Sequence, residues 1–225
     1  MPNKQEPEME YEKVIAKVQA AIDAAWQHQS GLPEFARKVP GLISDKQRHL
    51  LHNLCSAPGT VYLEAGLWQG ASLIAALAGN ERQVQKAYAI DDWYYCSSGR
   101  GAKELFDRHV STHLGGYGER LRVFDENLFD FDPSRLTDLA TVFYYDADHL
   151  RTGEGVLHFA DVLSDPCIIV LDDWDHPAHG VQAQWRTAVR EGPLSIVQEW
   201  ELPSRHKADL ALWWCGVYVA VIERK

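Results

Sequence analysis

The sequence predicts a doubly wound α/β fold built on a mostly parallel sheet. From residue 60 onward, short apolar runs alternate with segments of helical periodicity, as crossover units on a parallel sheet do. The last two β-rich runs, 195–200 and 213–223, have no helix between them. Because strands joined without a crossover pair as antiparallel neighbours, we expect the sheet to include a reversed C-terminal strand.

Composition indicates one ordinary folded domain. The 225 residues are 46% hydrophobic, which is enough to form a core, and their formal charge is −10. No apolar run reaches the roughly 18 to 20 residues of a membrane span, and the polar N-terminus lacks a signal-peptide core, so we expect a cytoplasmic protein without a membrane partner. An acidic balance without a Lys/Arg cluster argues against nucleic acid. We expect a small-molecule partner, and the sequence leaves a homo-oligomer open.

The predicted elements divide the chain into an N-terminal helical extension or cap, 1–45, and a main domain, 46–225, within one globular unit. An apolar stripe over 14–26 predicts a first helix, and a loop follows through Pro40. Ser44 with Gln47 three positions later is a capping-box pattern that starts a second helix. We expect strands at 60–65, 86–91, 120–124, 140–146 and 167–172, and helices near 70–79, 101–114, 153–164 and 179–191, with a turn around 133–138.

The first candidate site is the turn between the first strand and its helix. Gly66 and Gly70 let the backbone approach a ligand, and the new helix offers free amide donors. Asp91 ends the second strand, 21 positions after Gly70, where such an acid reaches a ribose diol. Only two glycines of a dinucleotide fingerprint are present, and Glu64 would repel a pyrophosphate. The turn therefore favours an adenosyl ligand with a cationic amino-acid end, and the alternative is a plain turn with a solvent-facing acid.

The second candidate site is a group of acids after two neighbouring strands. Asp146 and Asp148 end the fourth strand, and Asp172 and Asp173 end the fifth. The carboxyl ends of parallel strands meet at one edge, so these side chains should converge on one crevice. A hard divalent cation such as magnesium would relieve their repulsion and leave positions for substrate hydroxyls. The alternative is that they cap helices or face solvent.

Histidines form two further pairs. His109 and His113 share a helix face, but no third metal ligand follows at a telling distance, which favours a solvated face. His176 and His179 follow the double aspartate and could reach a substrate, with a plain loop role as the equal alternative.

Taken in order, these motifs resemble those of the class I S-adenosylmethionine-dependent methyltransferases, in the macrocin O-methyltransferase-like branch. The motifs that carry the resemblance are LEAG at 63–66 followed by GAS at 70–72, YDADH at 145–149 and VLDDW at 170–174. The branch includes metal-dependent O-methyltransferases of sugars and small aromatic natural products. The resemblance implies a Rossmann-like methyltransferase sheet with S-adenosylmethionine as cofactor and magnesium as the expected metal.

The resemblance also implies a role for each site residue. The cofactor set is Glu64 and Gly66 near the methionine end, Gly70 and Ser72 at the start of the helix, Asp91 (or its neighbour Asp92) on the ribose, and Glu126 near the adenine. The implied metal ligands are Asp146, Asp172 and Asp173, and the implied base is Asp148 or His149. Of these two, Asp148 is preferred, because a carboxylate beside a cation stays ionised well below neutral pH.

The sequence therefore predicts methyl transfer to a hydroxyl of a small metabolite. A nicotinamide-dependent oxidoreductase is the first alternative, disfavoured by the incomplete glycine pattern and the lack of a Tyr-x-x-x-Lys set. The second alternative is a catalytically silent adenosyl-binding partner subunit.

Overall fold

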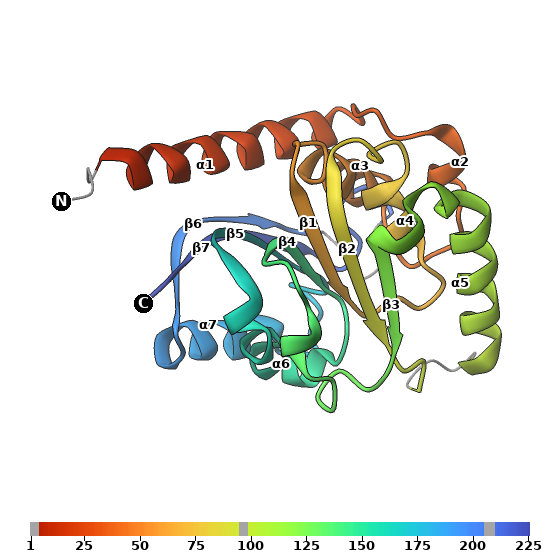
Figure 1. Cartoon of the computed structure of the whole chain (residues 1–225). Coiled ribbons are helices and arrows are strands. Elements are labelled where there is room, and N and C mark those ends of the chain that lie inside the picture. Colours follow the sequence, from red (N-terminus) through yellow and green to blue (C-terminus); the bar gives the residue numbers. More distant parts are fainter. Residues whose placement is uncertain (1–4, 95–98, 205–209) are drawn as a thin grey trace.

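The protein folds around a seven-stranded sheet with helices on both faces (Figure 1). The computed structural model describes residues 5–94, 99–204 and 210–225, with strand order β3-β2-β1-β4-β5-β7-β6. The strands are β1 (Thr60–Ala65), β2 (Val84–Asp91), β3 (Leu121–Asp125), β4 (Ala140–Tyr145), β5 (Leu163–Leu171), β6 (Leu194–Leu202) and β7 (Val217–Arg224). β7 runs antiparallel to both of its neighbours, which confirms the doubly wound α/β sheet with a reversed C-terminal strand.

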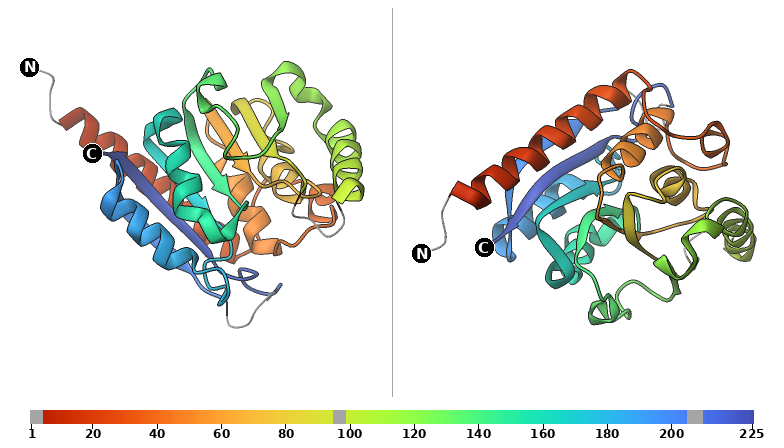
Figure 2. Two further views of the ribbon diagram at one scale, coloured as in Figure 1. Left: turned by 90° about the horizontal axis from the view of Figure 1, so that it is seen from below. Right: turned by 45° about the horizontal axis from the view of Figure 1, so that its top comes forward.

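The helices form two layers, one on each face of the sheet. They are α1 (Gln5–Trp26), α2 (Glu34–Arg37), α3 (Asp45–Leu54), α4 (Ala71–Leu77), α5 (Gly99–His113), α6 (Thr152–His158) and α7 (Val181–Glu191). Residues of α1, α3, α4 and α5 share one core with the sheet, and those of α6 and α7 share the other. Figure 2 shows from two further directions that α1 (red) and α7 (blue) lie on opposite sides of the sheet. No helix in the described ranges is both long and apolar enough to cross a membrane.

Strand alternation explains the two cores. Tyr62 and Tyr144 point to the α3 side, while Leu63 and Tyr145, one residue further along each strand, point to the α6 side. All four side chains are almost completely buried. The segments that follow β1 and β4 therefore leave the sheet from a tightly packed part of the core.

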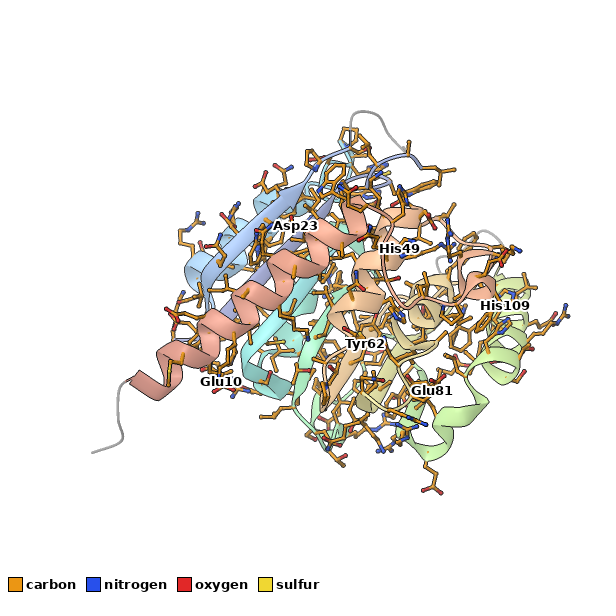
Figure 3. The ribbon with its side chains drawn as sticks, turned by 90° about the horizontal axis from the view of Figure 1, so that it is seen from above. Glu10, Asp23, His49, Tyr62, Glu81 and His109 are labelled. Atoms are coloured by element: carbon orange, nitrogen blue, oxygen red, sulfur yellow. The ribbon has the colours of Figure 1, made fainter. Side chains whose placement is uncertain are left out.

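The N-terminal helix lies across the α3 side of the sheet. Val18, Ile22 and Ala25 of α1 are buried at the spacing the apolar stripe predicts. In Figure 3, α1 crosses this face and His49 of α3 lies beyond its C-terminal end. There the rings of His28 and His49 meet at a centroid distance of 5.9 Å.

Three predicted boundaries are wrong. The short α2 forms inside the predicted loop. The helix expected to reach 164 ends at His158, and after a 3-10 turn β5 begins at Leu163, so the strand takes apolar residues that fitted the helical pattern. β7 begins at Val217 rather than 213, because Trp214 and Gly216 adopt left-handed backbone angles that do not continue a strand.

Replacing Gly155 of α6 by alanine tests the packing of the second core. A Cβ there would overlap the Tyr145 ring, which is buried and has no room to move. We expect Gly155→Ala to lower the free energy of unfolding in urea by about 1 to 3 kcal/mol. Gly101→Ala in α5 is the control, since its Cβ would meet open space, and it should leave stability unchanged or slightly raised. Equal stability of the two variants would contradict this account.

Candidate active site

Two adjoining cavities open at the C-terminal ends of the central strands. The larger has a volume of about 670 Å³ and is lined by the ends of β1, β2 and β4 and by residues 127–129. The smaller, of about 340 Å³, is lined by residues 41–43 and 71–72, the double aspartate and Trp214. Leu67, Trp68, Asp146 and His149 line both, so the two cavities share one wall.

The glycine turn brings the end of β1 against the end of β4. Gly66 has a φ of 90°, and a Cβ at this position would overlap the backbone carbonyl of Asp146. Gly70 also has a left-handed φ, of 85°, and begins α4. Glycine is needed at both positions because side-chain-bearing residues rarely adopt such angles.

Asp91 accepts three backbone hydrogen bonds, two of which hold the glycine turn. Its Oδ2 accepts from the amides of Leu67 (2.6 Å) and Trp68 (3.0 Å), and its Oδ1 accepts from the amide of Trp93 (2.6 Å). Asp92 accepts from Nδ2 of Asn127 at 2.7 Å. Both acids line the larger cavity, so the structure places both ribose candidates at the same site.

Glu64 is completely buried beneath the glycine turn. Its carboxyl group accepts hydrogen bonds from Oγ of Ser72 (2.5 Å) and from the hydroxyl of Tyr62 (2.7 Å). Burial raises the pKa of Glu64 to about 8. Ser72 lines the smaller cavity, whereas Glu64 is not among the lining residues of either. Ser72, which donates to Glu64, therefore lies between this carboxyl group and the smaller cavity.

Three acids meet where β4 and β5 end. The carboxyl groups of Asp146, Asp172 and Asp173 lie close enough to affect one another's ionisation. Burial and the neighbouring charges of Asp172 and Asp173 raise the pKa of Asp146 well above its usual range, and burial raises the pKa of Asp172 to about 7. Nε2 of Gln47 donates to Asp172 (2.7 Å) and to the hydroxyl of Tyr144 (3.0 Å). A positive charge bound among these carboxyl groups would therefore be stabilised.

Two histidines face these acids. Nε2 of His149 lies 3.4 Å from Oδ1 of Asp146 and 3.5 Å from Oδ2 of Asp173. Nδ1 of His179 lies 2.8 Å from the same Asp173 oxygen. Asp173 has a φ of 54°, a left-handed angle that is uncommon outside glycine. The donor set of carboxylates and imidazoles is chemically suited to a divalent cation.

Asp148 has a different setting from the other acids. Its Oδ1 accepts from the amide of Leu150 at 3.1 Å and caps the 3-10 turn His149–Arg151. Asp148 also lines the larger cavity. It therefore does what the helix-capping alternative expected while still facing the candidate site.

Glu126, expected near the adenine, directly precedes residues 127–129, which line the larger cavity. It is ion-paired with Arg135 at 2.6 Å on the surface and is not among the residues that line the larger cavity. The chain turns after β3, and the next residues, Asn127 and Phe129, line the cavity instead. The sequence of this short segment does not show that Glu126 lies on the surface while the next residues line the cavity.

Gln47 is a site residue that the sequence analysis missed. Ser44 does cap α3 through the amide of Gln47, as the capping box predicts. The Gln47 side chain, however, turns toward Asp172 and Tyr144. The only sequence signal was a polar residue on the apolar side of the helix, which the capping pattern already explained.

Other singled-out residues serve the scaffold. His109 contacts the Gln69 carbonyl at 2.9 Å, and His113 stacks on Phe35. Trp174 stacks on Tyr218 within the core. Tyr95 and Cys96 lie outside the described residues.

Comparison with known proteins finds the fold but no close relative. No protein-family model matches the chain, and no curated protein matches it. Solved structures do match. An O-methyltransferase from Bacillus cereus in complex with S-adenosylhomocysteine is 12% identical, with a TM-score of 0.61 over 92% of this chain and 91% of that one. The O-methyltransferase TomG from Streptomyces achromogenes, in complex with S-adenosylmethionine, is 17% identical, with a TM-score of 0.61 over 90% and 89%.

A third match is cofactor-bound Rv0187 from MTB, 18% identical, with a TM-score of 0.59 over 95% of this chain and 91% of that one. The three matches extend over nearly the whole of each chain. The chain thus has a Rossmann-like methyltransferase fold.

The raised pKa of Glu64 predicts how stability depends on pH. The folded protein keeps this proton up to about pH 8, whereas the unfolded chain releases it near the ordinary value of 4.5. The free energy of unfolding should therefore fall as pH rises between these two values. In Glu64→Gln, which cannot ionise, we expect the fall between pH 5 and 8 to be smaller by roughly 1 to 3 kcal/mol. Urea titrations at several pH values measure it, and parallel pH profiles of the two proteins would refute it.

Proposed function

We propose that the protein is an S-adenosylmethionine-dependent methyltransferase that methylates a hydroxyl of a small metabolite with the help of a divalent cation. The shared wall of the two cavities is the observation that carries the proposal. A donor and an acceptor bound on either side would meet beside Asp146 and His149. The methyltransferase fold and the cofactor-bound structures that share it support the same reading.

In this proposal the adenosyl group occupies the larger cavity. Asp91 and Asp92 offer carboxylates to the ribose hydroxyls, and Leu128 and Phe129 give the adenine an apolar wall. Gly66 leaves the backbone free to approach the ligand, and the methionine end extends toward Ser72 in the smaller cavity. S-adenosylmethionine supplies a methyl group bound to a sulfonium leaving group. The protein then has to align an acceptor oxygen and remove its proton.

The metal would be held by Asp146, Asp172 and Asp173, for which the sequence indicates magnesium. The raised pKa values of Asp146 and Asp172 support this assignment, because a cation among these carboxyl groups would relieve their repulsion. A bound cation supplies a lower pKa for the acceptor hydroxyl and a fixed position for its oxygen.

Asp148 is the proposed base. Its Oδ1 is held by the Leu150 amide, which leaves Oδ2 to take the proton from the acceptor hydroxyl. His149 faces the acids rather than a proton donor, and its proposed role is to bind and position.

Cofactor binding tests the proposal first. By isothermal calorimetry the protein should bind S-adenosylhomocysteine, and Asp91→Ala should weaken that binding about tenfold or more, because a charged acceptor and the support of the turn are both lost. Asp125→Ala is the matched control. Asp125 ends the neighbouring strand in register with Asp91, is exposed, and is not among the cavity-lining residues.

Each competing function has its own outcome in this experiment. Tighter binding of NAD than of S-adenosylhomocysteine would favour the oxidoreductase. Binding of S-adenosylhomocysteine without methyl transfer to any of a panel of hydroxylated metabolites, with Mg²⁺, Mn²⁺ or Zn²⁺ present, would favour the silent adenosyl-binding subunit.

Substitution of Asp148 tests the base. Asp148→Asn retains a side chain that can cap the 3-10 turn but removes the proton acceptor, so turnover should fall about 100-fold while S-adenosylhomocysteine affinity is retained. Asp132→Asn is the control, since Asp132 caps the 3-10 turn Pro133–Arg135 in the same way, away from both cavities. A larger loss of turnover in His149→Ala, with loss of the acidic limb of its pH profile, would assign the base to His149 instead.

A further inference from the structure

His149 and His179 lie beside the proposed metal site, but the proposed set of three carboxylate ligands gives them no role. We propose that His149, His179 and Asp173 form a three-ligand site for a first-row transition ion that imidazole binds well, such as Zn²⁺, in preference to Mg²⁺. The inference deepens the proposed function and rests on it only for the use of the ion in catalysis. Binding of the ion itself can be measured separately.

The candidate ligand atoms all lie within 4.8 Å of one another, and two of their separations fall just below and just above the range expected around one ion. Ligand atoms bonded to one ion at about 2.1 Å lie roughly 3.0 to 3.4 Å from each other in octahedral or tetrahedral geometry. The Asp173 oxygen lies 2.8 Å from Nδ1 of His179 and 3.5 Å from Nε2 of His149. Despite its 2.8 Å separation, Nδ1 of His179 makes no hydrogen bond. Closeness without a hydrogen bond is what two ligands of one ion show.

The histidines are held in place by one side chain. Nε2 of Gln184 in α7 donates to the backbone carbonyl of His149 at 3.0 Å and to that of His179 at 2.8 Å. The two imidazole rings stack almost in parallel, 4.7 Å apart. Gln184 therefore ties the loop before α7 to the end of β4, which keeps both rings beside Asp173. It is a positioning residue for this site.

The left-handed backbone of Asp173 is the second independent observation. Non-glycine residues in this conformation carry strain that the surrounding structure must overcome, and such strain clusters at functional sites. Here it belongs to the one carboxylate that contacts both histidines.

Ligand chemistry decides which ion is preferred. Mg²⁺ binds oxygen and dehydrates reluctantly, whereas imidazole nitrogen suits zinc, iron, nickel and copper. With two nitrogens among three ligands, the site should select a transition ion. Asp146 lies 3.4 Å from Nε2 of His149 and is available as a fourth ligand.

A second cluster of two histidines and one aspartate serves as a comparison, because its carboxylate already has a cationic partner. His28, Asp45 and His49 also lie close together. There, however, Arg37 donates to both oxygens of Asp45, at 2.9 and 2.7 Å, and Nζ of Lys46 lies 3.3 Å from Nε2 of His28. Cationic side chains already neutralise this carboxylate, so we expect no ion to bind.

The experiment measures metal binding by the whole, chelator-stripped protein. Zn²⁺ is titrated in competition with a chromophoric chelator, and Cu²⁺ is used as a spectroscopic probe. We expect one tight Zn²⁺ site that Mg²⁺ in large excess does not displace, and a copper electron paramagnetic resonance spectrum with coupling to two nitrogens. Loss of even an outer-sphere partner costs up to about 100-fold in metal affinity, so loss of the ligand in His179→Ala should cost about 100-fold or more and remove one nitrogen coupling.

Matched variants separate this site from other histidines. His176→Ala is the first control, because His176 stacks on His179 but is not part of the cluster. His28→Ala is the second, and both should leave zinc affinity within a few-fold of wild type. Gln184→Ala should weaken it about tenfold through lost positioning. Circular dichroism checks that each variant is folded.

The outcomes distinguish this inference from the proposed function. Zinc affinity that is unchanged in His179→Ala, lost in His28→Ala, or no higher than that for Mg²⁺ would overturn the transition-metal site, whatever the cofactor result. Failure to bind S-adenosylhomocysteine, with zinc binding and its loss in His179→Ala as expected, would overturn the methyltransferase proposal and leave the metal site standing.

Discussion

Repulsion among carboxyl groups at the ends of β4 and β5 is the constraint on which the rest of the site depends. Three neighbouring acids, two of them buried, cannot all be ionised without compensation. The protein supplies it in two ways: a hydrogen bond from Gln47 to Asp172, and two imidazoles beside Asp173. These groups come from three segments, since Gln47 lies in α3, His149 follows β4 and His179 precedes α7.

The fold places the compensating groups correctly. α3 lies on one face of the sheet and α7 begins beside the other, and both reach the strand ends where the acids lie. Gly66 allows the end of β1 to contact the end of β4 without a side chain between them. The cofactor turn and the acid cluster therefore share a wall, so a substitution that moves one of them also alters the other.

Sequence reasoning recovered the architecture because the fold depends on local pattern. Alternating apolar runs and helical stripes locate the strands within a few residues, and the absence of a crossover before the last run predicts the reversed β7. Boundaries were wrong where the decisive feature was a backbone angle, as at Trp214 and Gly216, or where apolar residues fit two patterns, as at 159–163.

The positions of some site residues were also predictable from local pattern, because they lie at the ends of strands. Asp91, Asp146 and Asp172 follow strands and were placed correctly at one edge of the sheet, whereas Glu126 turns to a surface arginine that no spacing rule identifies. Gln47 and His179 act across more than 100 and about 30 positions of sequence, on Asp172 and His149. Such contacts depend on how the helices pack against the sheet. No short stretch of sequence shows that packing.

The three amides held by Asp91 have a consequence for ligand binding. A turn that must become ordered when its ligand arrives loses conformational entropy at that moment, and the loss is subtracted from affinity. Here the backbone of 66–68 is already fixed by a carboxylate of the neighbouring strand. The entropy is lost once, during folding, and an incoming nucleoside meets a surface that is already shaped to receive it.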